Sequence, residues 1–210
     1  MTFTLVKENV AQICIDSHAA DYKGLKHVAK ILAGDILTVT GKEPEIVEQI
    51  QNVPQIVAAT KGTSDILAKW EEEKKIDLSV LEGKREVFMV RLIEEDGAEK
   101  LVIVETETIA TLYCLYYISE NIGVSPWVYW ADVVPAPKKE IVFDKSICTV
   151  SKEPSVRYRG FFMNDEWPSL GNFVMNTFGD FNEFFYEKVF DLLLRLKGNY
   201  FWPAMWSASL

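Results

Sequence analysis

Short apolar strands alternate with helix-length segments along the first 121 residues. Four apolar runs bounded by turn residues have the length of strands: 12–15, 55–59, 86–93 and 100–104. Three segments have helical spacing or a helix cap: 21–40, Thr63 or Ser64 through Trp70, and 108–121. An Asp96-Gly97 turn joins the last two strands as a hairpin. This order predicts an α/β domain with a mixed sheet covered by helices.

The C-terminal segment differs in composition. Residues 156–210 hold 15 of the 26 aromatic residues, and residues 133–140 ahead of them are rich in Pro and Lys, as in a connection. A chain of 210 residues is long enough for one large domain or two small ones. We therefore predict two domains, 1–153 and 154–210.

The second domain reads as a strand, a long loop, a helix and another strand. The first strand is the apolar run in YRGFFMNDEWP, residues 158–168. The helix is expected at 180–197, with Asp180 as its N-cap, and the next strand at 199–203. One and a half βα units cannot bury all their apolar surface, so a larger α/β structure is expected. An exposed aromatic strip is then expected, because six residues cannot all be covered: Phe181, Phe184, Phe185, Phe190, Trp202 and Trp206.

Three adjacent polar residues, Asn164-Asp165-Glu166, end the apolar run of the first of these strands. Because side chains alternate along a strand, Asn164 and Glu166 are expected to share one face at its C-terminal end. Barrel enzymes place catalytic groups at such ends. The alternative is an ordinary polar loop in which Asp165 caps the backbone.

Tryptophans near the strand ends are a second indication of function. Trp167, Trp202 and Trp206 can stack on sugar rings, whose C–H groups present an apolar face. Core packing is an equal alternative for Trp202. Trp127 and Trp130 lie in the stretch VSPWVYWADV. They either pack between the two domains or form a platform for a ligand.

Charge and motif content disfavour several classes of protein. The net charge of −9 disfavours nucleic acid, and no apolar run approaches the roughly 20 residues that span a bilayer. Neither a P-loop nor a GxGxxG motif occurs, which disfavours a nucleotide-binding protein. No signal peptide is visible, so a cytoplasmic location is expected, or an extracellular or periplasmic one if a leader was removed.

The cysteines and histidines predict neither a metal site nor a triad. No CxxC, HxH or HExxH pattern occurs. The direct neighbours Asp16, Ser17 and His18 cannot take triad geometry. Three cysteines lie far apart in apolar surroundings and are expected as buried free thiols: Cys14, Cys114 and Cys148.

Two sets of motifs resemble a known family. RGFFMNDE is followed by FG-x-FN-x-x-FYEKVFDLLLRLKGNYFWPAMW, between Tyr158 and Trp206. The first segment contains GDILTVTGKEPEIV, IDLSVLEGKREVF and ISENIGVSPWVYWADVVP in order. Together they resemble glycoside hydrolase family 115, the xylan α-1,2-glucuronidases, over nearly the whole chain.

The resemblance implies an N-terminal α/β domain followed by the first strand, helix and second strand of a (β/α)₈ TIM barrel. Family members are much longer, so the chain is expected to be an N-terminal fragment, inactive alone, of a glycoside hydrolase. Such enzymes remove glucuronic acid or its 4-O-methyl ether from glucuronoxylan with inversion, and no cofactor is needed. The implied partners are glucuronoxylan or aldouronic oligosaccharides and the C-terminal domains of the same enzyme. For the full-length enzyme, a homo-oligomer is a further option.

The resemblance also implies roles for the residues after the two strands. Glu166 is the first choice for an active-site carboxylate that holds the catalytic water or a sugar hydroxyl. Asp165 is the second acidic candidate and orients the loop, and Asn164 is expected to hydrogen-bond the substrate. Trp206 and Trp202 are expected to bind substrate.

The chain departs from the family pattern in two places. Trp167 stands where the family usually has a small residue after NDE. Residues 105–110 read Glu-Thr-Glu-Thr-Ile-Ala, where many members carry a loop like Gly-Ser-Asp-Lys-Arg-Gly. If that loop reaches the substrate, this chain lacks a basic group for a uronate carboxylate.

Two other readings of function stay open. One is a non-catalytic carbohydrate-binding or interaction module, in which the first domain folds alone and the aromatic tail docks on a partner. The other is a decayed gene fragment, in which Asn-Asp-Glu is a remnant without a site. Further βα units in the reading frame after Leu210 would favour the enzyme over both.

Overall fold

The chain folds into two compact units, which are described separately. The computed structural model describes four stretches of the chain: 1–19, 22–105, 108–164 and 166–203. The first unit combines Met1–Ser125 with Val134–Pro154, and the second combines Pro126–Val133 with the residues from Ser155 onward. The division after Pro154 falls one residue from the predicted boundary, but Pro126–Val133 clusters with the second unit rather than the first.

The first unit is built on a six-stranded mixed sheet with the strand order β3-β2-β4-β6-β5-β8. Its strands are β2 (Gln12–Ile15), β3 (Ile46–Val47), β4 (Gln55–Thr60), β5 (Phe88–Glu95), β6 (Ala98–Glu105) and β8 (Thr149–Val150). Strands β3, β2, β4 and β6 pair in parallel, whereas β5 is antiparallel to both β6 and β8. The predicted α/β domain with a mixed sheet is therefore confirmed.

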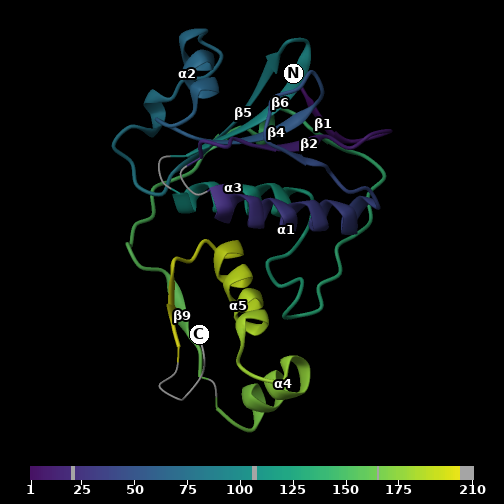
Figure 1. The fold of residues 1–210 in the computed structure, drawn as a ribbon, viewed down its shortest axis with the longest axis vertical. Helices are drawn as coiled ribbons and strands as arrows, with labels where there is room; N and C mark the ends of the chain where they lie inside the picture. Colours follow the sequence, from purple (N-terminus) through teal and green to yellow (C-terminus); the bar gives the residue numbers. More distant parts are fainter. Residues whose placement is uncertain (20–21, 106–107, 165, 204–210) are drawn as a thin grey trace. The chain divides into compact units, whose positions relative to one another are not determined.

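Helices cover both faces of this sheet. The long helices α1 (Tyr22–Thr40) and α3 (Thr108–Asn121) pack against each other and lie along one face (Figure 1). On the other face, α2 (Asp65–Glu72) and the short helix η1 (Ser79–Leu81) contribute to an apolar cluster around the fully buried Trp70. Both faces of the central strands are thus buried, which explains why β4 is buried at every position.

The hairpin between β5 and β6 turns at Asp96-Gly97, as predicted. Asp96 has φ = 51° and Gly97 has φ = 76°, so both central residues lie in the left-handed region that a type I′ turn requires. The sequence offers Thr63 or Ser64 as the cap of α2. In the structure Ser64 is the cap, and its side chain accepts a hydrogen bond from the Leu67 amide. Local chemistry therefore sets these two boundaries.

Several short elements of the first unit were not predicted. Strand β1 (Phe3–Val6) pairs antiparallel with β7 (Ile141–Phe143), which comes from the far end of the unit. A 3₁₀ turn, η2 (Lys145–Ile147), follows β7 and leads into β8. No helix among the described residues is both long enough and apolar enough to cross a membrane.

The second unit contains one helix more than predicted. Its parallel strands β9 (Gly160–Phe162) and β10 (Tyr200–Trp202) are joined through α4 (Ser169–Phe178) and α5 (Glu183–Arg195). The predicted long loop therefore contains α4. The predicted cap of the last helix is also wrong, because Asn182 rather than Asp180 accepts hydrogen bonds from the first amides of α5.

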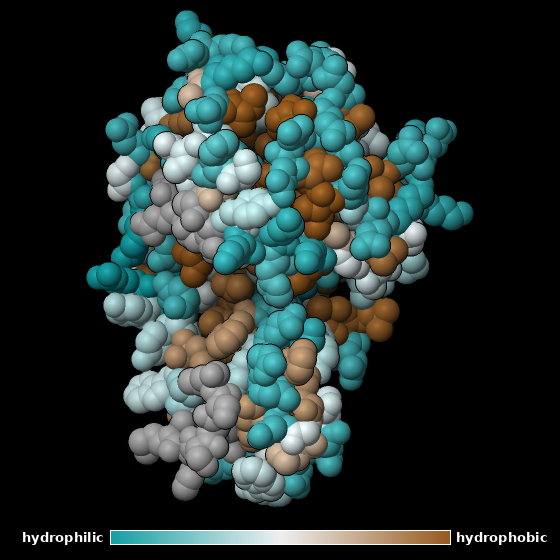
Figure 2. Space-filling model, in the orientation of Figure 1, coloured by the Kyte–Doolittle hydropathy of each residue, from teal (hydrophilic) through white to brown (hydrophobic). Residues whose placement is uncertain are grey.

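An aromatic cluster forms the core of the second unit. Phe185 is fully buried and contacts Phe178 and Phe181 with ring centroids 5.7 and 5.3 Å apart. The prediction that the six aromatic side chains cannot all be covered is confirmed, although Phe181 and Phe185 are buried in this cluster. Three other members of the strip are exposed: Phe184, Phe190 and Trp202. On the face drawn in Figure 2, hydrophobic residues reach the surface between hydrophilic ones.

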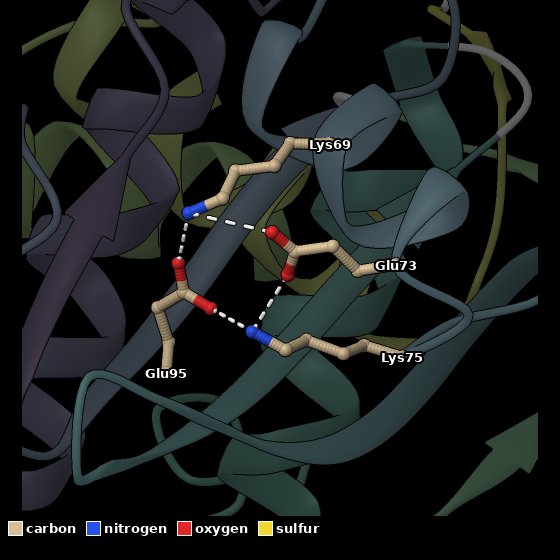
Figure 3. A network of polar contacts seen from close by, with 4 residues as sticks. All are labelled: Lys69, Glu73, Lys75 and Glu95. Atoms are coloured by element: carbon tan, nitrogen blue, oxygen red, sulfur yellow. Dashed lines mark hydrogen bonds and ion pairs between the residues drawn. The ribbon is translucent and has the colours of Figure 1, made fainter.

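Four alternating charges hold α2 to the end of β5. Figure 3 shows the carboxylate of Glu95 between the ammonium groups of Lys69 and Lys75, which both also approach Glu73. Lys69 Nζ lies 2.5 Å from Glu95 and 3.9 Å from Glu73, and Lys75 Nζ lies 2.8 Å from Glu73. Burial raises the pKa of Glu95, but hydrogen bonds from Lys69 and Lys75 outweigh it and lower the pKa to about 2.

Replacing Glu95 with Gln is expected to lower the free energy of unfolding by about 2 kcal/mol at pH 7. The Glu95 carboxylate is buried, but water screens the partly exposed ammonium groups of its partners. The expected loss of stability is therefore smaller than that for breaking a fully buried ion pair. The folded-state pKa of Glu95 lies below its ordinary value of 4.5. The contribution of the ionised carboxylate to the free energy of unfolding is therefore complete above pH 4.5 and is lost as the pH falls towards 2. Urea unfolding between pH 7 and pH 2 measures both effects.

Glu94→Gln is the matched control, since Glu94 is the exposed neighbour on the same strand. Its free energy of unfolding should stay within about 0.5 kcal/mol of the wild-type value. An equal loss in the two variants, or a difference for Glu95→Gln that does not shrink in acid, would contradict the assigned role of the network.

Candidate active site

The two strands of the second unit end side by side. Strands β9 and β10 are parallel and in register, with Gly160 opposite Tyr200 and Phe162 opposite Trp202. Their C-terminal ends therefore lie at the same edge. Residues that follow β9 and β10 start from neighbouring points, which is the arrangement by which parallel strands assemble a site.

Asn164 and Glu166 lie beyond the strand rather than on it. Strand β9 ends at Phe162, so the predicted alternation of side chains does not extend to these two residues. Both are exposed. The Glu166 carbonyl accepts a hydrogen bond from the Gly171 amide at 3.1 Å, which ties this loop to the first turn of α4. Glu166 is therefore an exposed residue of the loop that follows β9, and its catalytic role stays a prediction.

Two of the predicted site residues fall outside the described residues. These are Asp165, between the loop positions just described, and Trp206, which follows β10. Their predicted roles, in catalysis for Asp165 and in substrate binding for Trp206, stay predictions.

The two faces of the β9–β10 pair differ. On one face Phe161 and Phe201 meet edge to face at 5.9 Å, and Phe201 continues to Tyr186 and Phe190 of α5. On the other face Phe162 and Trp202 meet at 6.0 Å and are 57% and 58% exposed. Trp202 thus lies outside the core of the described unit, on the face away from α5, and its contact with sugar stays a prediction.

A second aromatic surface surrounds a cavity elsewhere in the same unit. Its volume is about 570 Å³, and its walls include Tyr129, Trp130 and Phe173, with Asp132 and Ser169 as polar groups. The Trp130 indole N–H donates to the Lys188 carbonyl at 3.0 Å, which fixes the ring. The sequence left Trp130 open between packing and a platform; in the structure it packs against rings of its own unit and also lines this cavity.

The polar cluster after β2 does not form a triad. Asp16 lies 3.4 Å from Nδ1 of His18, and the Ser17 hydroxyl lies 3.5 Å from that same nitrogen. A triad needs the carboxylate and the hydroxyl on opposite ring nitrogens. The absence of triad geometry that the sequence predicted is therefore confirmed.

Glu105 and Lys100 are buried charged residues that the sequence analysis missed. The Glu105 carboxylate accepts hydrogen bonds from the Thr60 hydroxyl at 2.9 Å and the Thr111 amide at 2.7 Å, so it joins β4, β6 and α3. Lys100 donates to the carbonyl of Val53 at 2.6 Å and fixes the loop before β4, and burial lowers its pKa. Their positions in apolar strands gave no signal of function, and their partners are structural.

The described residues form no cluster that could hold a metal ion, and the cysteines are free. Within 1–19, 22–105, 108–164 and 166–203, no three His, Cys, Asp or Glu side chains group to hold a metal ion. All three cysteines are free, and Cys14 and Cys114 are buried as predicted, whereas Cys148 is only partly buried. Burial raises the pKa of Cys14 to about 12, so its thiol is a poor nucleophile.

Comparisons with known proteins agree on one class. Residues 151–210 match the family model "Glycosyl hydrolase family 115". One similar solved structure is described as a novel family GH115 4-O-methyl-alpha-glucuronidase, BtGH115A, with specificity for decorated arabinogalactans. Its sequence is 32% identical to this chain, and the TM-score is 0.80. The match covers 99% of this chain and 26% of the chain of that protein. The fold and these matches make the chain similar to glycoside hydrolases.

The family is the one that the sequence motifs indicated: the resemblance to glycoside hydrolase family 115 is confirmed. This chain spans about a quarter of the length of the solved family member. Another solved structure, of CpGH84D, is 10% identical over 77% of this chain and 23% of its own, with a TM-score of 0.46, too low to support an argument. No curated protein sequence matches the chain.

Proposed function

We propose that this chain is part of an α-glucuronidase that hydrolyses terminal α-linked glucuronosyl or 4-O-methylglucuronosyl groups on a polysaccharide. The observation that carries this proposal is the match along 99% of the chain to a family 115 4-O-methyl-alpha-glucuronidase. Glucuronoxylan with α-1,2-linked side groups is the substrate that the family resemblance implies, whereas the solved relative is described as specific for decorated arabinogalactans. Both polymers can present the same uronosyl group, so the proposal names that group.

We further propose that the residues from 154 onward begin a (β/α)₈ barrel. Two observations support this: β9 and β10 are parallel neighbours, and a helix packs on one face of the pair. Parallel strands occur almost only in sheets that are covered on both faces, and here the face with Phe162 and Trp202 is open. Further strands would place that face inside the barrel.

In this proposal Glu166 acts as one of two carboxylates at the mouth of the barrel. An inverting glycosidase needs an acid and a base about 6.5–9.5 Å apart, with a water between the base and the sugar. Glu166 positions the water or a sugar hydroxyl, Asn164 hydrogen-bonds the sugar and Asp165 orients the loop. The second carboxylate would come from sequence beyond these 210 residues, so the chain alone is expected to be inactive.

The proposal is tested by comparing the 210-residue chain with a longer form that continues past Leu210. Each is incubated with glucuronoxylan and, separately, with uronosylated arabinogalactan. The longer form should release the uronic acid, and ¹H NMR at early times should show the β-anomer first, because inversion of an α-linkage gives β. No release from either polymer by the longer form would overturn the proposed activity, and release by the short chain would overturn its inactivity.

A second candidate function is a non-catalytic carbohydrate-binding module. The cavity lined by Tyr129, Phe173 and Asp132 favours it, because aromatic rings beside a carboxylate suit a neutral sugar with free hydroxyls. Saturable binding of neutral oligosaccharides that Phe173→Ala abolishes, together with no hydrolysis by the longer form, would favour this function.

A further inference from the structure

The indole of Trp167 lies flat on the backbone of α4. A Cβ placed on Gly171 would lie 2.4 Å from Cδ2, 2.6 Å from Cε2 and 2.8 Å from Cε3 of the Trp167 ring. Cδ2 is bonded to three other ring atoms, so nothing can approach it so closely within the ring plane. The Gly171 α-carbon must therefore face one flat side of the indole.

Two further contacts define the setting of this ring. Phe181 meets Trp167 edge to face, with centroids 6.3 Å apart, and Phe181 is itself buried. The Gly171 amide is hydrogen-bonded to the Glu166 carbonyl, which closes the turn that carries Trp167. The residue as a whole is nevertheless 60% exposed, so indole surface that Gly171 and Phe181 do not cover stays accessible. A supported ring with accessible surface can stack on a ligand and loses little side-chain entropy on binding.

We propose that the accessible surface of the Trp167 indole binds a neutral pyranose ring of the polysaccharide backbone, next to the uronosyl group held at Glu166. This inference rests on the proposed function and adds a subsite to it. Trp167 directly follows Glu166, and the Glu166 carbonyl closes the turn that carries the indole, so the proposal places the stacked sugar beside the one held at Glu166. The ring face carries negative electrostatic potential and favours C–H groups over a carboxylate. The stacked sugar is therefore the neutral one that carries the uronosyl group.

The test is a titration of the longer form with two neutral probes, xylotriose and β-linked galactotriose, followed by calorimetry. Trp167→Ala should weaken binding of at least one probe about fivefold to tenfold. Trp167→Phe keeps a flat ring, so its affinity for each probe should stay within about threefold of the wild-type value. Gly171→Ala should weaken binding as Trp167→Ala does, because its methyl group would displace the indole.

Phe184→Ala is the control for loss of an exposed aromatic ring, since Phe184 lies on α5 of the same unit and is 62% exposed. It should bind both probes as the wild type does. Unchanged affinity in Trp167→Ala, equal weakening in Phe184→Ala, or no saturable binding by the wild type would each overturn the subsite. The proposed function fails on a different result, the absence of uronic acid release, so the two failures are distinguishable.

Discussion

Glu166→Gln is expected to lower kcat for uronic acid release by the longer form about a thousandfold. The amide has the size of the carboxylate but cannot exchange a proton with the catalytic water, and positioned acid–base groups are worth about 10²–10⁴ in rate. The fold should not change, because the Glu166 side chain is exposed and the turn uses its backbone carbonyl. Steady-state kinetics on glucuronoxylan and on uronosylated arabinogalactan measure the effect.

Glu183→Gln provides the control for loss of a negative charge in the same unit. Glu183 is exposed in the first turn of α5, so its loss should change kcat by less than about twofold. Trp167→Ala should instead raise KM for the polymer and leave most of kcat. A Glu166→Gln enzyme that keeps more than a tenth of wild-type kcat would remove Glu166 from catalysis.

Gly160→Ala is expected to destabilise the second unit by about 3 kcal/mol or more. A Cβ on Gly160 would lie 1.5 Å from the Tyr200 carbonyl oxygen and 2.5 Å from its carbon, which no side-chain rotation can relieve. The two strands would have to separate at the first pair of their register. Overpacking of side chains alone costs about 1–3 kcal/mol, and a clash with backbone, which rotamer changes cannot relieve, is expected at or above the top of that range. Urea unfolding monitored by near-UV circular dichroism measures the loss.

Gly34→Ala is the matched glycine control for this experiment. Nothing lies within 4 Å of a Cβ at Gly34, which sits in the middle of α1. The same substitution there should leave stability unchanged or raise it by up to about 1 kcal/mol, because Ala favours the helix over Gly. Comparable destabilisation at both positions would mean that the close approach of β9 and β10 is not the cause.

Local patterns were sufficient for the elements with strong local chemistry. The Asp96-Gly97 turn needs two residues with positive φ, and the sequence provides a pair that tolerates it. Helix α3 has the bounds expected from its apolar residues and the following Gly123. In such elements, the residues that decide the conformation lie within a few positions of one another.

The missed elements depend on distant contacts. Strand β1 acquires its partner β7 from the other end of the unit, which no local pattern indicates. Helix α4 begins at Ser169, and its N-cap residue Pro168 provides no side-chain hydrogen bond. The helix also contains glycine and asparagine, so its local signal is weak. Burial of Val174 and the cover by Trp167 stabilise it instead. Because α4 was missed, the burial of Phe185 could not be predicted.

The candidate site likewise has one part that local sequence patterns predict and another that depends on tertiary contacts. The sequence identified Glu166 and Asn164 as polar residues near a strand end, and the structure puts both just past β9. The support of Trp167 by Gly171 is a tertiary contact between a loop and a helix, and residue types alone do not reveal it.

The type I′ turn between β5 and β6 also bears on the order in which the sheet assembles. The hairpin closes through two residues, within about 1–10 μs, whereas β4 reaches β6 only after the segment between Lys61 and Gly97 is looped out. Pulsed hydrogen exchange during refolding should therefore protect the amides of β5 and β6 before those of β2, and simultaneous protection would contradict this order. The antiparallel hairpin then acts as the template on which the slow parallel part of the sheet is laid down, strand by strand.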